Sequence, residues 1–236
     1  MTLYQKIKAW FVDYGYMLRG TFTMIVHHEP PMHYLGHIVT GKAPVVLIPG
    51  ISHRWSSIKR LGDAISLQGH PVYIVPELGY NLYRIPTSAK TLRSLIERED
   101  LSSAVIVAHS KGGLIGKYVL AHYNADGRVA GMVAIAAPFS GSAMAKLVPH
   151  DSFRELLTDS KIIRDLEKHR AENERIISII PEYDNHVWAE KGSFLEGAAE
   201  NIEVSVSGHH KVLFSEIVVQ TVLHSIEKLQ NRAAAL

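Results

Sequence analysis

The sequence predicts an α/β fold with a mostly parallel sheet of about six strands flanked by helices. From residue 43 onward, short runs rich in β-branched residues alternate with longer amphipathic segments, a pattern typical of repeated strand–helix units. The runs are almost continuously apolar, as expected for strands that are buried on both faces of a parallel sheet. A charged segment after the fourth run breaks the alternation and predicts a short helical cap insertion.

The first 26 residues precede this alternation and predict a separate helix. They are rich in aromatic side chains, and Lys6, Lys8, Asp13 and Arg19 interrupt the apolar character before it reaches the length of a signal peptide or membrane span. We therefore expect a cytoplasmic protein whose N-terminal helical segment, residues 1–26, packs on the domain. Peripheral contact of this helix with a membrane or lipid interface is the alternative.

The strands and helices of the sheet follow in order from the alternation. We expect strands at 43–49, 71–76, 104–108, 129–136, 175–180 and 202–207. The segments between and after them predict helices at approximately 55–68, 88–99, 111–124 and 212–230. A chain of 236 residues can bury one sizeable core. We therefore expect a single domain over residues 1–236.

The insertion lies between the fourth and fifth predicted strands. Within the charged interval from Asp151 to Glu174, apolar residues recur at helical spacing: Leu156, Leu157, Ile162, Ile163 and Leu166. Together with the turn before it, this interval forms a candidate helical cap over residues 140–174. Open α/β sheets bind ligands at the carboxyl edge, so we expect the cap to lie there. A solvated helix with no role at the site is the alternative.

Composition excludes several classes of function. Lys and Arg total 25 against 23 acidic residues, so the chain lacks the positive surface that nucleic acid would require. The absence of cysteine excludes disulfides, thiolate catalysis and zinc sites built on sulfur. Residues 27–37 contain four histidines, but Pro30 and Pro31 interrupt any helical presentation to a metal. We expect neither a metal nor another cofactor.

Ser110 lies in Ala108-His109-Ser110-Lys111-Gly112, between a predicted strand and a predicted helix. A sharp turn there would lift the hydroxyl off the sheet edge, and the small residues at 108 and 112 would let the backbones approach. The segment resembles the nucleophile elbow of the α/β-hydrolases, with Ala108 in place of the commoner glycine, as in small bacterial lipases and esterases. The resemblance implies the α/β-hydrolase fold and a nucleophilic Ser110. A serine that only caps the helix is the alternative.

A serine nucleophile needs a histidine to accept its proton. In the family the chain order is serine, acid, histidine. The stretch from Gly208 to Ser215 resembles the histidine loop of bacterial lipases. Its register implies that His209, and not the neighbouring His210, is the base.

The histidine in turn needs an acid that fixes its tautomer. The fifth predicted strand runs into Pro181-Glu182-Tyr183-Asp184-Asn185, and the acid is expected directly after this strand. The spacing from Asp184 to Val187 resembles the acid loop of lipases and implies that Asp184 is the acid. Glu182 is the competing candidate.

Acyl transfer also needs two backbone N–H donors aimed at the developing oxyanion. Lys111 follows the nucleophile and supplies one. Pro49-Gly50-Ile51 resembles the lipase oxyanion loop, in which Ile51 would supply the other. Pro49 stands where histidine is usual, which leaves open what holds the loop. We expect the Lys111 ammonium to pair with a nearby carboxylate.

Four aromatic residues follow the carboxyl ends of predicted strands and are candidates to line a substrate pocket. They are Trp55, Tyr80, Tyr83 and Phe139. Packing in the core is the alternative for each of them.

These expectations combine into one function. The resemblance implies a serine hydrolase that cleaves carboxylic esters through an acyl-enzyme on Ser110. The charged cap favours soluble short- to medium-chain esters over insoluble lipid. The alternatives are a triacylglycerol lipase that binds an interface, an acyltransferase, thioesterase or amidase with the same triad, and a non-catalytic interaction protein. The sequence does not determine the oligomeric state.

Overall fold

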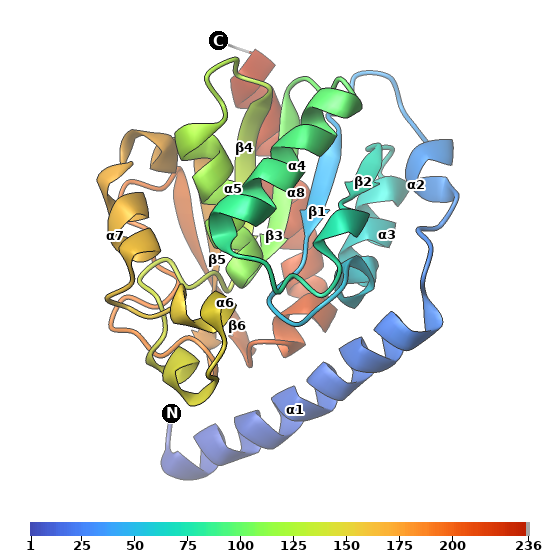
Figure 1. Ribbon diagram of the computed structural model, residues 1–236. Helices are drawn as coiled ribbons and strands as arrows, with labels where there is room; N and C mark the ends of the chain where they lie inside the picture. The colour runs from blue at the N-terminus through green and yellow to red at the C-terminus, as the bar shows by residue number, and fades with distance from the viewer. Residues whose placement is uncertain (235–236) are drawn as a thin grey trace.

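A six-stranded parallel sheet forms the centre of the computed structural model, which describes residues 1–234 (Figure 1). The strand order is β2-β1-β3-β4-β5-β6, and each neighbouring pair is parallel. The strands are β1 (Val45–Ile48), β2 (Val72–Ile74), β3 (Ala104–His109), β4 (Val129–Ile135), β5 (Ile176–Tyr183) and β6 (Glu200–Ser207). The predicted α/β fold class and its six strands are confirmed.

Both faces of the sheet are buried. On β1, Val45 and Leu47 pack into one apolar cluster while Val46 and Ile48 pack into another, and all four are fully buried. The helices that cover the two faces are α4 (Ile85–Arg98) and α5 (Lys111–His122) on one side and α3 (Lys59–Leu67) and α8 (Glu216–Ala234) on the other. Burial on both sides is the reason that the strands are continuously apolar.

Short elements connect these helices and strands. They are α2 (His33–Gly36), η1 (Trp55–Ile58), η2 (Pro76–Leu78) and η5 (Lys211–Phe214). Helix α4 begins at Ile85, ahead of the predicted residue 88, because Pro86 lies in the first helical turn. In the first turn of a helix the backbone N–H groups have no acceptor within the helix. A proline there, which has no N–H, therefore removes no helical hydrogen bond.

The insertion between β4 and β5 is helical, as expected. It consists of η3 (Ala143–Leu147), α6 (Asp151–Arg154), α7 (Lys161–Lys168) and η4 (Ala171–Arg175). Leu156, Ile163 and Leu166 are buried in the cluster that α4 and α5 share, so the apolar stripe of the insertion packs on the body of the molecule. In Figure 1 α7 lies beside α5, and α6 lies near the carboxyl edge of the sheet.

Helix α1 (Leu3–Val26) lies outside the layers formed by the sheet and its covering helices and runs across the carboxyl edge of the sheet (Figure 1). Thr2 and Gln5 form a reciprocal capping box at its start. Its inner side contacts η1 and η5, which follow β1 and β6. Among residues 1–234, no helix combines the length and apolar character needed to cross a bilayer.

Candidate active site

Ser110 is the single residue between β3 and α5. Its backbone has φ 53° and ψ −125°, a conformation that is strained for a residue with a side chain. Its N–H donates to the Ile135 carbonyl at 2.9 Å, which holds the turn against β4. A Cβ atom on Gly112 would lie 2.6 Å from the Ile48 carbonyl oxygen, so glycine is required for α5 to approach β1. The strand–turn–helix predicted at Ser110 is present.

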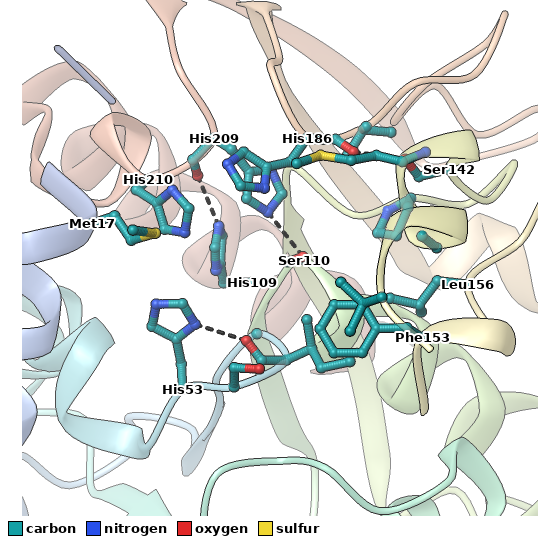
Figure 2. Close-up of a pocket in the computed structure, with 18 residues that line it drawn as sticks. Met17, His53, His109, Ser110, Ser142, Phe153, Leu156, His186, His209 and His210 are labelled. Atoms are coloured by element: carbon teal, nitrogen blue, oxygen red, sulfur yellow. Dashed lines mark hydrogen bonds between the residues drawn. The ribbon is translucent and has the colours of Figure 1, made fainter. Parts of the chain in front are cut away.

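Three side chains from separate parts of the chain form a hydrogen-bonded series. His209 Nε2 lies 2.9 Å from Ser110 Oγ, as Figure 2 shows, and His209 Nδ1 lies 2.8 Å from Asp184 Oδ2. Ser110 and His209 are buried. The competing acid, Glu182, is exposed, and the ring of His210 bonds to a different carboxylate. The structure therefore brings together the serine, acid and histidine that the motifs indicated.

The loop after β5 orients the Asp184 carboxylate. Its Oδ1 accepts hydrogen bonds from the backbone N–H groups of His186 at 2.7 Å and Val187 at 2.9 Å, which leaves Oδ2 for His209. Asn185 Oδ1 accepts the backbone N–H of His209 at 3.0 Å. The acid loop therefore holds both the ring and the backbone of His209.

The charge of Asp184 sets the protonation behaviour of His209. Burial alone would lower the pKa of His209, but attraction to Asp184 and its hydrogen bond raise this pKa above the ordinary 6.5. Burial alone would raise the pKa of Asp184, but His209 and the two N–H donors hold it below its usual value. Asp184 is therefore ionised near neutral pH, as an acid that orients an imidazole must be.

Lys111 and Ile51 carry the N–H groups that are expected to bind an oxyanion. Lys111 is the first residue of α5, so its N–H has no acceptor within the helix. Among residues 1–234, the N–H of Ile51 takes part in no hydrogen bond, and both Ile51 and Ser110 line the same cavity. A Cβ atom on Gly50 would meet the side chains of His109 and Ser110 at 3.1 and 3.2 Å, so glycine allows the loop to lie this close to Ser110.

A buried asparagine, absent from the sequence prediction, holds the loop Pro49-Gly50-Ile51. Asn81 Nδ2 donates to the Pro49 carbonyl at 2.8 Å. The Lys111 ammonium, also fully buried, donates to the carbonyls of Asn81, at 2.9 Å, and of Tyr83. The expectation that Lys111 pairs with a carboxylate is wrong: its partners are carbonyl oxygens. Burial lowers the pKa of Lys111 to about 8.

Asp13 of α1 is the main residue that the sequence prediction missed at this site. Its carboxylate is fully buried and accepts hydrogen bonds from the backbone N–H groups of His210, at 2.7 Å, and Lys211, at 2.9 Å. It also accepts a bond from the ring Nδ1 of His210 at 3.0 Å. Burial alone would raise the pKa of Asp13, but these partners hold it well below its usual range. The available signal was its place as the one acid within α1.

Three further histidines surround the series. The ring of His186 stacks on His209 with centroids 4.9 Å apart. His109 Nε2 lies 2.9 Å from the His209 carbonyl, and His53 Nδ1 lies 2.8 Å from the Ile51 carbonyl (Figure 2). Because a carbonyl only accepts, these nitrogens carry the protons. Burial lowers the pKa of His53 to about 4 and that of His186 to about 3, so both rings are neutral near pH 7.

A cavity of about 230 Å³ opens beside Ser110. Phe153 and Leu156 lie on the opposite side of Ser110 from His210 and His53 (Figure 2). The apolar side chains that line it are Met17, Ile51, Pro138, Met144, Ala145, Val148, Phe153, Leu156 and Val187. Helix α1, the loop that contains Ile51 and the insertion thus each contribute to its wall.

The four aromatic residues expected in this pocket do not line it. Trp55 packs in the core, edge-on to Tyr34, and Phe139 is buried in the cluster on the other face of the sheet. Tyr80 and Tyr83 are 54% and 56% exposed. Their loop turns two carbonyls inward to Lys111, and the tyrosine side chains face solvent.

Two groups of side chains have the residue types and spacing to hold a metal ion. They are Asp13 with His186 and His210, and His122 with Asp165 and His169. Each contains a hydrogen-bonded histidine–aspartate pair, at 3.0 Å and 2.9 Å respectively. The first pair joins α1 to the histidine loop and the second joins α5 to α7, so we assign both to packing and positioning.

Comparison with known proteins identifies the fold. Neither a family model nor a curated protein sequence matches the chain. A Bacillus licheniformis lipase structure has a TM-score of 0.66 and 14% identity over 81% of this chain and 95% of that chain. Aspergillus fumigatus lipase B has a TM-score of 0.69 and 17% identity over 82% of this chain and 54% of its own. A metagenomic carboxyl esterase has a TM-score of 0.60 and 18% identity over 84% and 76%.

At these identities the likeness is one of fold. The parallel six-stranded sheet and the sharp turn at Ser110 agree with it. The chain therefore has the α/β-hydrolase fold.

Proposed function

We propose that this protein is a serine hydrolase that cleaves carboxylic esters through an acyl-enzyme on Ser110. The observation that carries the proposal is the hydrogen-bonded series from Ser110 through His209 to Asp184, at 2.9 and 2.8 Å. Such a series activates a hydroxyl that is a poor nucleophile at its ordinary pKa. The lipase and esterase names of the similar structures support the same class of reaction.

The first half of the reaction forms the acyl-enzyme. His209 Nε2 accepts the Ser110 proton as Oγ attacks the ester carbonyl carbon, and Asp184 stabilises the resulting imidazolium. The carbonyl oxygen becomes an oxyanion, to which the N–H groups of Ile51 and Lys111 donate. When the intermediate collapses, the bond to the alcohol oxygen breaks, and His209 gives its proton to the departing alcohol.

The second half releases the acid. His209 accepts a proton from water, whose oxygen attacks the acyl carbon, and the same N–H groups stabilise the second oxyanion. Collapse breaks the bond to Ser110 Oγ, which takes the proton back from His209. Neither half requires a cofactor.

The cavity supports a preference for short- to medium-chain acyl groups. Its volume of about 230 Å³ is below the range of about 300–1,000 Å³ typical of pockets for drug-sized ligands. Its apolar lining includes Phe153 and Leu156 of the insertion, which suits an acyl chain and not a charged group. Both features favour a small apolar acyl group.

Active-site labelling and a substrate panel test the proposal together. A fluorophosphonate probe should label the wild-type chain and leave Ser110→Ala unlabelled, because the probe reacts with an activated serine. With p-nitrophenyl esters of increasing length, kcat/KM should peak at short or medium chains. Absence of both labelling and turnover would instead favour a non-catalytic interaction protein. Turnover only with an amide, only with a thioester or only in the presence of an acyl acceptor would assign the triad to amidase, thioesterase or acyltransferase chemistry.

A further inference from the structure

Helix α1 carries an exposed apolar stripe on the side that faces away from the sheet. The residues of this outer stripe are Tyr4, Ile7, Phe11, Leu18, Phe22 and Ile25. Each is between 48% and 78% exposed. Their spacing of three, four or seven residues places them on one side of the helix. The stripe extends over most of a 24-residue helix, about 36 Å long.

The opposite side of α1 packs against the rest of the protein. Ala9, Asp13, Gly20 and Met24 are buried against the body of the protein, and Trp10 Nε1 donates to the Tyr183 hydroxyl at 2.9 Å. The helix is therefore apolar on both sides, and the inner side alone is covered. Scattered exposed apolar residues are ordinary, but a continuous stripe of this length marks a contact surface.

The charges on α1 indicate which kind of partner the outer stripe binds. Its basic residues Lys6, Lys8 and Arg19 are exposed, whereas its one acid, Asp13, is buried. The exposed part of α1 is therefore apolar and cationic, a composition that suits a helix lying in the headgroup region of an anionic bilayer. A second copy paired through the same surface would instead bring like charges together.

Helix α1, which carries the stripe, also borders the cavity. Met17, on α1, lines the cavity together with Val148 of the insertion, which is 38% exposed. Leu147, next to it, is 69% exposed. In Figure 1 α1 and the part of the insertion near α6 border the same end of the molecule. A surface that binds the outer stripe would therefore lie next to the cavity.

We propose that the outer stripe of α1 binds an anionic phospholipid bilayer and holds the cavity of Ser110 at the membrane surface. The helix lies parallel to the bilayer with Phe11 and Phe22 below the headgroups and Lys8 among them. Substrate then reaches the cavity from the lipid phase. Binding itself does not depend on the proposed ester hydrolysis, so Ser110→Ala should bind vesicles as the wild-type protein does.

Co-sedimentation of the full chain with vesicles tests this proposal. Wild-type protein should bind phosphatidylcholine vesicles that contain phosphatidylglycerol and bind pure phosphatidylcholine vesicles more weakly. The double variant Phe11→Ser/Phe22→Ser should lose about tenfold or more in affinity for both, because two exposed aromatic side chains no longer enter the interface. Lys8→Gln should lose about fivefold on the anionic vesicles alone.

Matched controls separate the stripe from general surface effects. Leu67→Ser removes an apolar side chain that is 67% exposed on α3, and Lys90→Gln removes an exposed charge on α4. Both controls should bind as the wild-type protein does. All variants should keep its circular dichroism, and all except Ser110→Ala should keep its turnover of a soluble ester.

Three results would overturn the proposal. The first is a wild-type protein that does not bind the anionic vesicles. The second is an equal loss of vesicle binding in Phe11→Ser/Phe22→Ser and in the control Leu67→Ser. The third is a concentration-dependent dimer, measured by light scattering, that forms without vesicle binding and is broken by the double variant. That dimer would assign the outer stripe to a second copy of the chain.

Discussion

Two neighbouring histidines of one loop each bond to an aspartate carboxylate, yet their surroundings differ. His209 bonds to Asp184 at 2.8 Å and His210 bonds to Asp13 at 3.0 Å. His209 also reaches Ser110, and its pKa is raised, whereas burial lowers the pKa of His210. The same residue pair therefore occurs once at the proposed base, His209, and once as an anchor between α1 and the histidine loop. The groups that surround each ring decide which of the two roles the histidine has.

The two carboxylates also differ in what their second oxygen holds. Asp184 Oδ1 accepts hydrogen bonds from N–H groups of its own loop. The orientation of this carboxylate therefore does not depend on His209. Asp13 Oδ1 binds N–H groups of the histidine loop, at His210 and Lys211. Asp13 is thus a positioning residue that joins α1 to the loop carrying His209. Substitutions in the two pairs distinguish these roles.

The largest expected difference is between the two histidines themselves. His209→Ala should lower kcat/KM for p-nitrophenyl butyrate by about 10⁴-fold or more, because triad members act as a unit. His210→Ala should lower it by about tenfold at most, since the backbone N–H bonds to Asp13 remain. An inactive His210→Ala beside an active His209→Ala would reverse the assignment of the base.

The second largest difference is expected between substitutions of the two acids, Asp184 and Asp13. Asp184→Asn should lower kcat by about 10³–10⁴-fold, because the amide disfavours the required tautomer of His209. Asp13→Asn should lower kcat by about 10–100-fold through displacement of the loop. Glu182→Gln is the control and should keep wild-type activity. An equal loss in Asp184→Asn and Glu182→Gln would contradict the assignment of the acid.

Stability should depend on Asp13 in a pH-dependent way. Its pKa in the folded protein lies below the ordinary 3.8, so its stabilisation is complete above that pH and is lost as the pH falls through the folded pKa. Asp13→Asn should lower the free energy of unfolding by about 3 kcal/mol at pH 7. Urea unfolding of both proteins at pH 7 and pH 3 checks this, because the difference should shrink at pH 3. A difference that is the same at both pH values would exclude an ionised Asp13.

The smallest expected effect is a displacement of the pH–rate profile. His209 must be neutral to accept a proton, and its pKa is raised above 6.5, so kcat/KM should rise with pH through a midpoint above 6.5. Asp184→Asn should move that midpoint to lower pH, and Asp13→Asn should move it in the same direction by less. A profile that is flat from pH 5 to 9 would exclude His209 as the base.

The sequence by itself determined the parts of this protein that depend on neighbouring residues. Strands that are buried on both faces must be apolar at every position, so runs such as Val45–Ile48 predict the sheet. The turn at Ser110 needs small residues beside it, and Gly112 shows why, because a Cβ atom would strike β1. His209 and Asp184 lie in short loop patterns after strands, where a local motif also indicates the residue.

Tertiary structure alone decided which distant side chains meet. Asp13 contacts a loop 197 residues away in sequence, and Asn81 holds Pro49 from the loop that follows η2. Sequence position placed Trp55 and Tyr80 after strands, but the path of each loop took them to the core and to solvent. Such contacts depend on how elements pack against one another, and no local pattern encodes that packing. For the same reason, only the fold revealed which side of α1 is buried and which is left exposed.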